Sequence, residues 1–230
     1  TKIKTHKFST LYGDGKVFGQ PKGVRTFVLV EICTDKKISG IGETYSGIYA
    51  PETIEHIVNL ISKYLINKNP LNMNLINDEI NLPFIGQNGI IKSVISSIEI
   101  ALYDIISKSN NISLFKLIKN QKPKPINAYA SGGSVTYSPS KIEQDVTEIL
   151  SKGFNAYKMR VGFQSIKNDM KRIEAARALL GKNHYLMIDA IMGTLKVKWN
   201  YKNALNNINK ISVYNPLWIE EMQLLYFLQK

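Results

Sequence analysis

Two patterns of hydrophobic and polar residues divide the chain into halves. In the second half, short apolar runs that end in polar residues alternate with stretches whose apolar residues recur every three or four positions, as in amphipathic helices. The apolar runs span 126–133, 154–162, 185–193 and 216–222, and the helical stretches span 138–153, 165–181 and 200–211. This order predicts parallel strands joined by helices.

Helix-capping residues support two of these helical stretches. Ser138 precedes Pro139, a pair that is typical of a helix start, and Gly153 is typical of a helix end. Ser165 and Gly181 bracket the next helical stretch in the same way.

The polar ends of the apolar runs recur at a constant interval. Lys158 and Asp189 lie 31 residues apart, and so do Asp189 and Glu220. A (β/α)8 barrel of about 250 residues spends about 31 residues on each unit, and its active site lies at the C-terminal ends of the strands. A doubly wound sheet can show similar spacing, but it gives no reason for charged residues at three consecutive strand ends. A barrel is therefore favoured.

The first half follows another pattern. Residues 25–34 and 38–44 are two apolar-rich runs around a short polar turn, which predicts an antiparallel hairpin. Two helical stretches follow at 51–65 and 88–109. The proline-containing segment 121–125 favours extended chain and forms a natural linker into the second half.

These patterns predict an α+β domain over 1–125, followed over 126–230 by the first four βα units of a TIM-type (β/α) barrel. Four units are half of a closed barrel, so the barrel part is expected to be incomplete at the C-terminus. Its open strand edges and uncovered apolar surface would favour association, which makes a homo-oligomer one expected outcome.

Composition limits the classes of function. The net charge of +12 suggests nucleic acid at first, but only four of the 30 Lys and Arg residues are Arg, the main reader of base edges. We therefore predict no nucleic-acid partner. No apolar run reaches the roughly 18 residues of a membrane span, and the single Cys33 excludes a disulfide framework. These features are typical of a cytoplasmic protein without a membrane partner.

Lys158 and Arg160 share one face of a predicted strand, because successive strand side chains point to opposite faces and Met159 takes the other. Two neighbouring cations repel each other unless an anion lies beside them. One interpretation is an exposed edge strand with solvated charges. The other is an anion-binding site at the mouth of the barrel.

Asp189 and Glu220 are candidate metal ligands at the ends of the next two strands. Asp189 has apolar neighbours, where an unpaired carboxylate is costly, and carboxylates on adjacent strands repel unless a cation lies between them. Oxygen ligands without His or Cys nearby favour a hard ion, Mg2+ first and Mn2+ as the alternative. Either carboxylate could instead pair with Lys158 or Arg160. A carboxylate substrate that bridges the metal and the cations would make the two interpretations compatible.

The sequence resembles the enolase superfamily, and within it the mandelate racemase and muconate lactonizing enzyme family, over essentially the whole chain. The stretches that carry the resemblance are GIGET (40–44), SSIEIALYDI (96–105), YKMRVG (157–162), LMIDAIMG (186–193) and WIEE (218–221). The resemblance implies an N-terminal capping domain over a barrel. It also implies Mg2+-dependent abstraction of the proton alpha to a carboxylate, through an enediolate intermediate.

The same resemblance assigns roles to the strand ends. Asp189 would be the first metal ligand and Glu220 the second. Lys158 and Arg160 would be catalytic residues, at the place where the family usually has Lys-x-Lys. Arg160 stands where the second Lys is commonly the general base, and a guanidinium is a poor base because it stays protonated.

The resemblance also bears on the reaction. A racemase needs bases on both faces of its substrate, so Arg160 favours an acid-sugar dehydratase-like lyase or isomerase that acts on a small carboxylate. A racemase, epimerase or cycloisomerase of the same family remains an alternative, and so does a catalytically dead truncated fragment. Tyr12 and Tyr45 fall in loops that would close over the substrate. The third metal ligand and the later acid/base residues are expected beyond residue 230.

Overall fold

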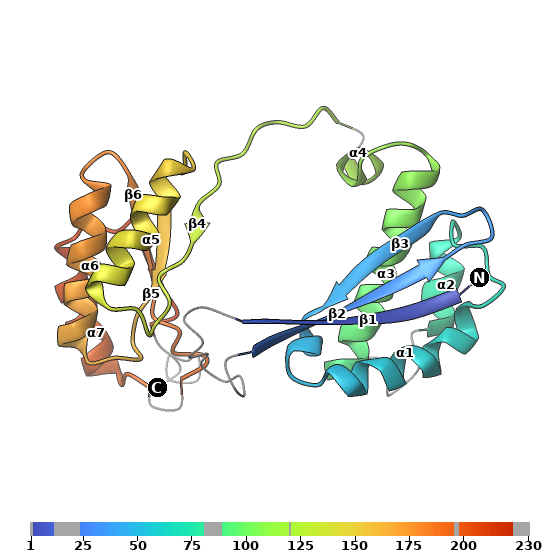
Figure 1. Ribbon diagram of the computed structural model, residues 1–230, viewed down its shortest axis with the longest axis horizontal. Helices are drawn as coiled ribbons and strands as arrows, with labels where there is room; N and C mark the ends of the chain where they lie inside the picture. Colours follow the sequence, from blue (N-terminus) through green and yellow to red (C-terminus); the bar gives the residue numbers. More distant parts are fainter. Residues whose placement is uncertain (1, 12–23, 81–88, 120, 196–197, 223–230) are drawn as a thin grey trace. The chain divides into compact units, whose positions relative to one another are not determined.

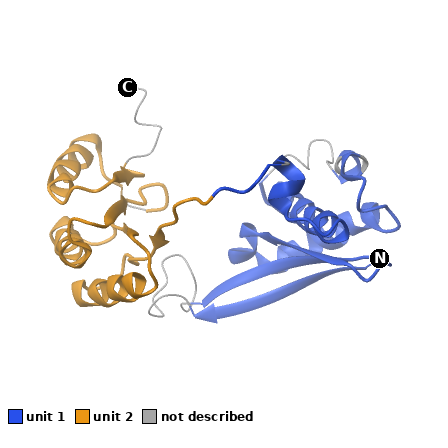
Figure 2. Cartoon of the chain, turned by 90° about the horizontal axis from the view of Figure 1, so that it is seen from above, with its two compact units in different colours: residues 1–124 blue, residues 125–230 orange. Residues whose placement is uncertain are grey.

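The computed structural model describes residues 2–11, 24–80, 89–119, 121–195 and 198–222. The chain divides into two compact units, Thr1–Lys124 and Pro125–Lys230 (Figure 1; Figure 2). Each unit has its own hydrophobic core. Among the described residues, no helix has the length and apolar character needed to cross a membrane.

Unit 1 is a three-stranded antiparallel sheet with helices. Its strands are β1 (Lys2–Leu11), β2 (Val24–Cys33) and β3 (Ser39–Thr44), in the order β1-β2-β3. Its helices are the short η2 (Tyr45–Ile48), α1 (Pro51–Leu65), α2 (Met73–Ile80), α3 (Gly89–Ser109) and α4 (Leu114–Lys119). The predicted hairpin is confirmed as β2 and β3, and the two long predicted helices are confirmed as α1 and α3. Strand β1 and helices α2 and α4 were not predicted.

The core of unit 1 follows from residue spacing. Val28, Val30 and Ile32 alternate along β2 and are buried on one face. Helix α1 buries Ile54, Val58, Ile61 and Leu65, which recur on one side of a helix. Helix α3 packs closely against β3, because β3 carries two glycines. A side chain at Gly40 or Gly42 would collide with the α3 backbone at Ala101 or Ser97.

Unit 2 is a parallel sheet with helices on one face. Its strands are β4 (Ala130–Ser131), β5 (Ala156–Arg160), β6 (Tyr185–Asp189) and β7 (Trp218–Glu220), and they pair in chain order. The connecting helices are α5 (Pro139–Ser151), α6 (Ile166–Leu180) and α7 (Tyr201–Ser212). Figure 2 shows these helices gathered on one side of the strands. The predicted repeat of strands and helices is therefore confirmed.

Each helix of unit 2 begins at a capping side chain. The Ser138 hydroxyl accepts a hydrogen bond from the Lys141 amide at 3.2 Å, and Ser165 caps α6 in the same way. The side-chain oxygen Oδ1 of Asn200 accepts a hydrogen bond from the backbone amide of Asn203 at 2.8 Å. These bonds satisfy amide groups that a helix start would leave unpaired, so the caps fix where each helix begins.

The two faces of the unit 2 sheet differ in kind. Tyr157, Met159, Leu186 and Ile188 are fully buried in the core that α5, α6 and α7 share with the sheet. The residues that alternate with them point to the other face, and they include Lys158 on β5 and Asp189 on β6. The candidate chemistry therefore lies on the face opposite the helices.

Candidate active site

Three polar side chains lie side by side at the C-terminal ends of neighbouring strands. Arg160 on β5 pairs in register with Asp189 on β6, and Asp189 pairs with Glu220 on β7. The 31-residue interval from Asp189 to Glu220 thus corresponds to one level of the sheet, whereas Lys158 pairs with Met187 and lies one level lower than Asp189. Glu221, which follows Glu220, lies instead against Gly193.

Lys158 lies on β5 two residues before Arg160, and its side chain contacts both carboxylates. Its Nζ lies 2.6 Å from Glu220 Oε1, to which it donates a hydrogen bond, and 3.5 Å from Asp189 Oδ2. The Lys158 side chain is 15% exposed, Asp189 is 9% exposed and Glu220 is 39% exposed. Two carboxylates from different strands therefore converge on a single positive charge, with Lys158 and Asp189 largely buried and Glu220 partly exposed.

This surrounding keeps Lys158 charged. Burial opposes the charge, but the hydrogen bond to Glu220 and the negative charges of Asp189 and Glu220 outweigh it. The net effect raises the pKa of Lys158 above its ordinary value. Lys158 is thus an ammonium ion that holds its proton at neutral pH.

A backbone hydrogen bond fixes the Asp189 carboxylate. Its Oδ1 accepts a hydrogen bond from the Ile191 amide at 2.9 Å, which leaves Oδ2 as the oxygen nearer Lys158. Ile191 has a φ of +46°, and a β-branched residue adopts this left-handed conformation only when its surroundings impose it. The end of β6 is therefore a shaped turn that orients one carboxylate oxygen.

Arg160 does not share this ion cluster. Its guanidinium donates hydrogen bonds toward β4, to the backbone carbonyl of Gly132 at 3.4 Å and to the hydroxyl of Ser131 at 3.5 Å. Both are long, so they hold the guanidinium loosely. Arg160 lies at the level of Asp189 and Glu220 with its donors only weakly engaged.

Acidic side chains on the helices brace the loops that follow β4 and β5. Asp145 on α5 accepts hydrogen bonds from the Tyr157 hydroxyl at 2.6 Å and the Gly133 amide at 2.8 Å. Burial is the main reason that the pKa of Tyr157 is raised, and the hydrogen bond to Asp145 adds to it, so the phenol remains a neutral donor. The loop that follows β4 is tied to the core in this way.

A second brace links two loops. Asp169 and Arg172 on α6 form a 2.7 Å ion pair whose side chains are fully buried. Asp169 accepts from the Gly162 amide, and Arg172 donates to the carbonyl of Ser134. These bracing residues were missed in the sequence, where acids and arginines on helices look like ordinary solvated charges.

The residues present fit part of a Mg2+ site. Asp189 and Glu220 supply oxygen donors that converge on one cation, which is the donor type that Mg2+ prefers. Within the described residues, no group of three or more His, Cys, Asp and Glu side chains could hold a metal ion. The described part of the chain thus offers two of the ligands that a firm site needs.

Of the two tyrosines predicted to lie in substrate loops, only Tyr45 falls within the described residues. Tyr12 lies outside the described residues. Tyr45 begins η2 in unit 1, is 64% exposed, and meets the ring of Tyr49 edge-on with centroids 6.0 Å apart. Its role at the substrate stays a prediction.

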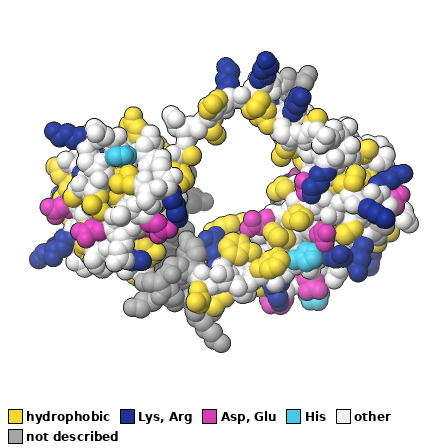
Figure 3. All heavy atoms as spheres, turned by 45° about the horizontal axis from the view of Figure 1, so that its top comes forward, with side chains coloured by type: hydrophobic (Ala, Val, Ile, Leu, Met, Phe, Trp, Pro, Cys, Tyr) yellow, Lys and Arg dark blue, Asp and Glu magenta, His cyan; other side chains and the backbone are white. Residues whose placement is uncertain are grey.

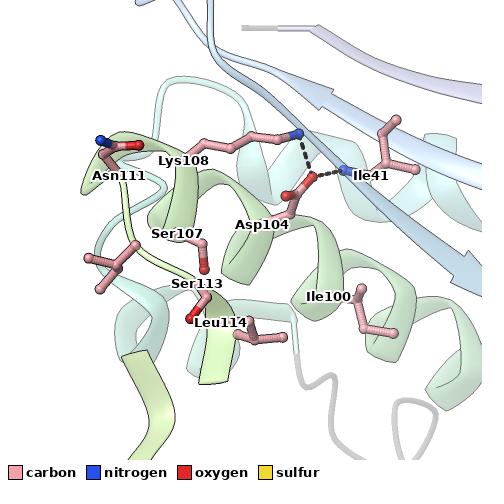
Figure 4. A pocket seen from close by; sticks show the side chains of 9 residues that line it. Ile41, Ile100, Asp104, Ser107, Lys108, Asn111, Ser113 and Leu114 are labelled. Atoms are coloured by element: carbon pink, nitrogen blue, oxygen red, sulfur yellow. Dashed lines mark hydrogen bonds and ion pairs between the residues drawn. The ribbon is translucent and has the colours of Figure 1, made fainter. Parts of the chain in front are cut away.

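A separate hollow of about 600 Å³ lies in unit 1 beside β3, α3 and α4 (Figure 4). On its wall, Asp104 accepts from the Ile41 amide at 3.0 Å, and Lys108 donates to the Ser39 carbonyl at 2.8 Å. Asp104 and Lys108 also pair with each other at 2.6 Å. These contacts satisfy backbone groups along the outer edge of β3. We therefore assign Asp104 and Lys108 a structural role.

The basic residues do not form one patch on the face that Figure 3 draws. Lys and Arg side chains are scattered over both units there, between acidic and uncharged ones. A nucleic-acid surface usually gathers such charges on one face or along one helix. The absence of a nucleic-acid partner stays a prediction.

Comparison with known proteins identifies the family. Residues 20–119 match the family described as "Mandelate racemase / muconate lactonizing enzyme, N-terminal domain", and residues 141–224 match "Enolase C-terminal domain-like". The chain belongs to the enolase superfamily. The predicted resemblance and the fold of a capping domain followed by a partial barrel are thereby confirmed.

Relatives of this enolase superfamily chain catalyse several reactions. It is 26% identical over 205 residues to the N-succinyl-L-Arg/Lys racemase of Bacillus cereus, covering 84% of this chain and 51% of that protein. It is 26% identical over 219 residues to the L-talarate/galactarate dehydratase of Salmonella typhimurium, covering 93% of this chain and 54% of that protein. The chain thus spans about half the length of these curated relatives.

A solved structure shows the same fold. A racemase from Streptomyces coelicolor with bound magnesium superposes with a TM-score of 0.80, at 24% identity, over 97% of this chain and 62% of that one. At this identity the likeness supports the fold alone.

Proposed function

We propose that the chain is part of a Mg2+-dependent lyase or isomerase that removes the proton alpha to the carboxylate of an acid sugar, with dehydration as the reaction. The observation that carries the proposal is the convergence of Asp189 and Glu220 on one cation at the strand ends. These two residues would hold the metal, with Mn2+ as the alternative ion. When bound, the metal stabilises the negative charge that develops as the alpha proton leaves.

The remaining polar residues would bind the substrate and move protons. Arg160 lies level with both carboxylates, and its loosely held guanidinium can take up a substrate carboxylate or developing charge. Lys158 would contact the substrate carboxylate or take part in proton transfer. Since a guanidinium is a poor base, Arg160 favours dehydration, which needs one base, over racemisation, which needs two.

The relatives support an enolase-type lyase or isomerase, but they do not favour dehydration over the other reactions of that class. They include a racemase and a dehydratase, and also a cycloisomerase for D-galactarolactone from Agrobacterium fabrum at 30% identity. Racemisation, epimerisation or cycloisomerisation is therefore the alternative within the family. A third possibility is a fragment without activity, because two carboxylates are few ligands for Mg2+. A homo-oligomer, and a cytoplasmic location inferred from the single Cys33, stay predictions.

Metal binding tests the site itself. Mn2+ should bind the 230-residue chain, as followed by its electron paramagnetic resonance signal, and Mg2+ should displace it. Asp189→Asn should weaken this binding by more than the roughly tenfold that losing a supporting residue costs. Glu143→Gln, which removes one exposed charge from α5, is the control and should change little. Equal affinities for the two variants would rule out Asp189 as a ligand.

Proton exchange tests the chemistry. The longest polypeptide that the gene encodes should be incubated with Mg2+ and acid sugars such as galactarate in D2O. Loss of the alpha-proton NMR signal would show the abstraction that all three reactions share, and the product would then distinguish them. A dehydratase releases water, a racemase or epimerase inverts the carbon, and a cycloisomerase opens or closes a ring. Metal binding without any exchange would favour the inactive fragment.

A further inference from the structure

The ammonium group of Lys158 occupies the point where the two proposed metal ligands converge. Its Nζ is 2.6 Å from Glu220 Oε1 and 3.5 Å from Asp189 Oδ2. A lysine on β5 thus reaches across β6 to β7, the next strand but one in the sheet. The same lysine would be needed elsewhere, at the substrate, if the proposed function is correct.

The carboxylates need a positive charge even without metal. Asp189 is 9% exposed, so water screens its charge poorly, and Glu220 is its register partner on the adjacent strand. Two carboxylates placed in this way repel each other. The Lys158 ammonium relieves that repulsion with a hydrogen bond to one oxygen and a close approach to another.

A divalent ion held by both carboxylates would lie close to the Lys158 ammonium. Mg2+ binds its oxygen ligands at about 2.0–2.1 Å. An ion bound by both Asp189 and Glu220 would therefore lie against an ammonium that is already 2.6 Å from Glu220, and the two cations would repel each other. Binding of a divalent ion would therefore favour movement of the ammonium away from the carboxylates.

We propose that Lys158 is an internal counter-ion that fills the metal site of the metal-free protein and is released when Mg2+ binds. This inference rests on the proposed function. The ring of Tyr129 offers a place beside the site for the released group, since Nζ already lies 5.8 Å from its centroid, within the range of a cation–π contact. The exchange keeps the site folded without metal and delivers the amine toward the substrate only once the metal is present.

A lysine variant tests the exchange. Lys158→Met keeps the length and apolar stem of the side chain but removes the competing charge. It should bind Mn2+ about tenfold more tightly than the unmodified chain, equivalent to about 1.4 kcal/mol. In EDTA it should melt at a lower temperature, because the carboxylates lose their counter-ion. Lys152→Met is the matched control, since Lys152 also pairs with a glutamate at 2.6 Å but is 60% exposed just after the end of α5. It should change neither quantity.

A measurement on the unmodified chain covers the case in which Lys158→Met does not fold. Acetylation of lysines, read by mass spectrometry, should modify Lys158 several-fold faster with Mg2+ than with EDTA, while Lys152 reacts equally in both. The exchange would be wrong if the reactivity of Lys158 did not change with Mg2+. It would also be wrong if Lys158→Met bound Mn2+ equally or more weakly. Neither result would contradict the metal site itself. An unmodified chain that binds no Mn2+ would instead overturn the metal site, and the exchange with it.

Discussion

The rings of Tyr129 and Trp218 meet edge to face with centroids 5.6 Å apart, although they belong to opposite borders of the unit 2 sheet. Tyr129 directly precedes β4 and Trp218 begins β7. Three strand spacings of about 4.8 Å would separate these borders by about 14 Å in a flat sheet. The sheet must therefore curl toward the face that carries Lys158, as the wall of a barrel does.

This ring contact gives the first prediction. Tyr129→Ala should lower the free energy of unfolding of unit 2 by about 0.5–1.5 kcal/mol, because it removes the aromatic pair with Trp218, although the Tyr129 residue is itself 43% exposed. Urea unfolding followed by circular dichroism measures the change. Tyr185→Ala removes a 52% exposed ring from β6 and should cost less. Equal losses would mean that the contact adds nothing.

The second prediction concerns the hydrogen bond between Tyr157 and Asp145. Tyr157→Phe should lower the free energy of unfolding by about 1.5–3 kcal/mol, because the hydroxyl donates to a charged acceptor at 2.6 Å in a buried place. Chemical denaturation measures it. Tyr201→Phe, on an exposed ring of α7, is the control and should be neutral. A neutral Tyr157→Phe variant would show that Asp145 finds another donor.

The third prediction concerns the buried ion pair of Asp169 and Arg172. Arg172→Met alone should lower the free energy of unfolding by about 3–5 kcal/mol, because it leaves Asp169 charged and buried without its partner. Adding Asp169→Leu should recover part of that loss, since no lone charge then remains. Thermal melts of the two single variants and the double variant form the required cycle. Simple additivity of the two losses would contradict a coupled pair.

The fourth prediction concerns pH and Glu31 on β2. The hydrogen bond from His6 is the main cause that lowers the pKa of Glu31 below its ordinary value of 4.5; burial opposes it, and the charge of Lys4 and a hydrogen bond from Ser39 add to it. A lowered pKa gives stability that is present above the unfolded value and is lost as the pH falls through the folded value. Glu31→Gln should therefore cost under about 1 kcal/mol at pH 7.

The pH profile provides the check on Glu31. Melting temperatures of the unmodified chain and Glu31→Gln, taken from about pH 3 to pH 7, should converge below about pH 4. Glu55→Gln changes an exposed carboxylate on α1 and should track the unmodified chain throughout. A constant gap at every pH would mean that Glu31 acts through packing and not through charge.

Several features of this fold were predictable because they repeat or follow local rules. Ser138 and Ser165 mark helix starts by simple capping chemistry, and the interval between Asp189 and Glu220 reflects the length of one barrel unit. Strand β1 was missed because Lys2–Leu11 is mostly polar and its pairing to β2 is not local.

The details of the site depended on information that a linear pattern does not contain. The reach of Lys158 across a strand to Glu220 is set by the curl of the sheet and by side-chain rotamers. The bond from Ile191 to Asp189 requires a backbone conformation that isoleucine rarely adopts. Sequence could indicate which side chains share a face, but not which of them touch.

The outer edge of β3 bears on synthesis of the chain at the ribosome. Unit 1 emerges before the parallel strands of unit 2, and exposed strand edges capture newly made strands. The Ile41 amide and the Ser39 carbonyl on that edge are already bonded to Asp104 and Lys108 of α3. A helix thus takes the place of a further strand at the β3 edge, which protects these two backbone groups from pairing with strands of unit 2 that are made later.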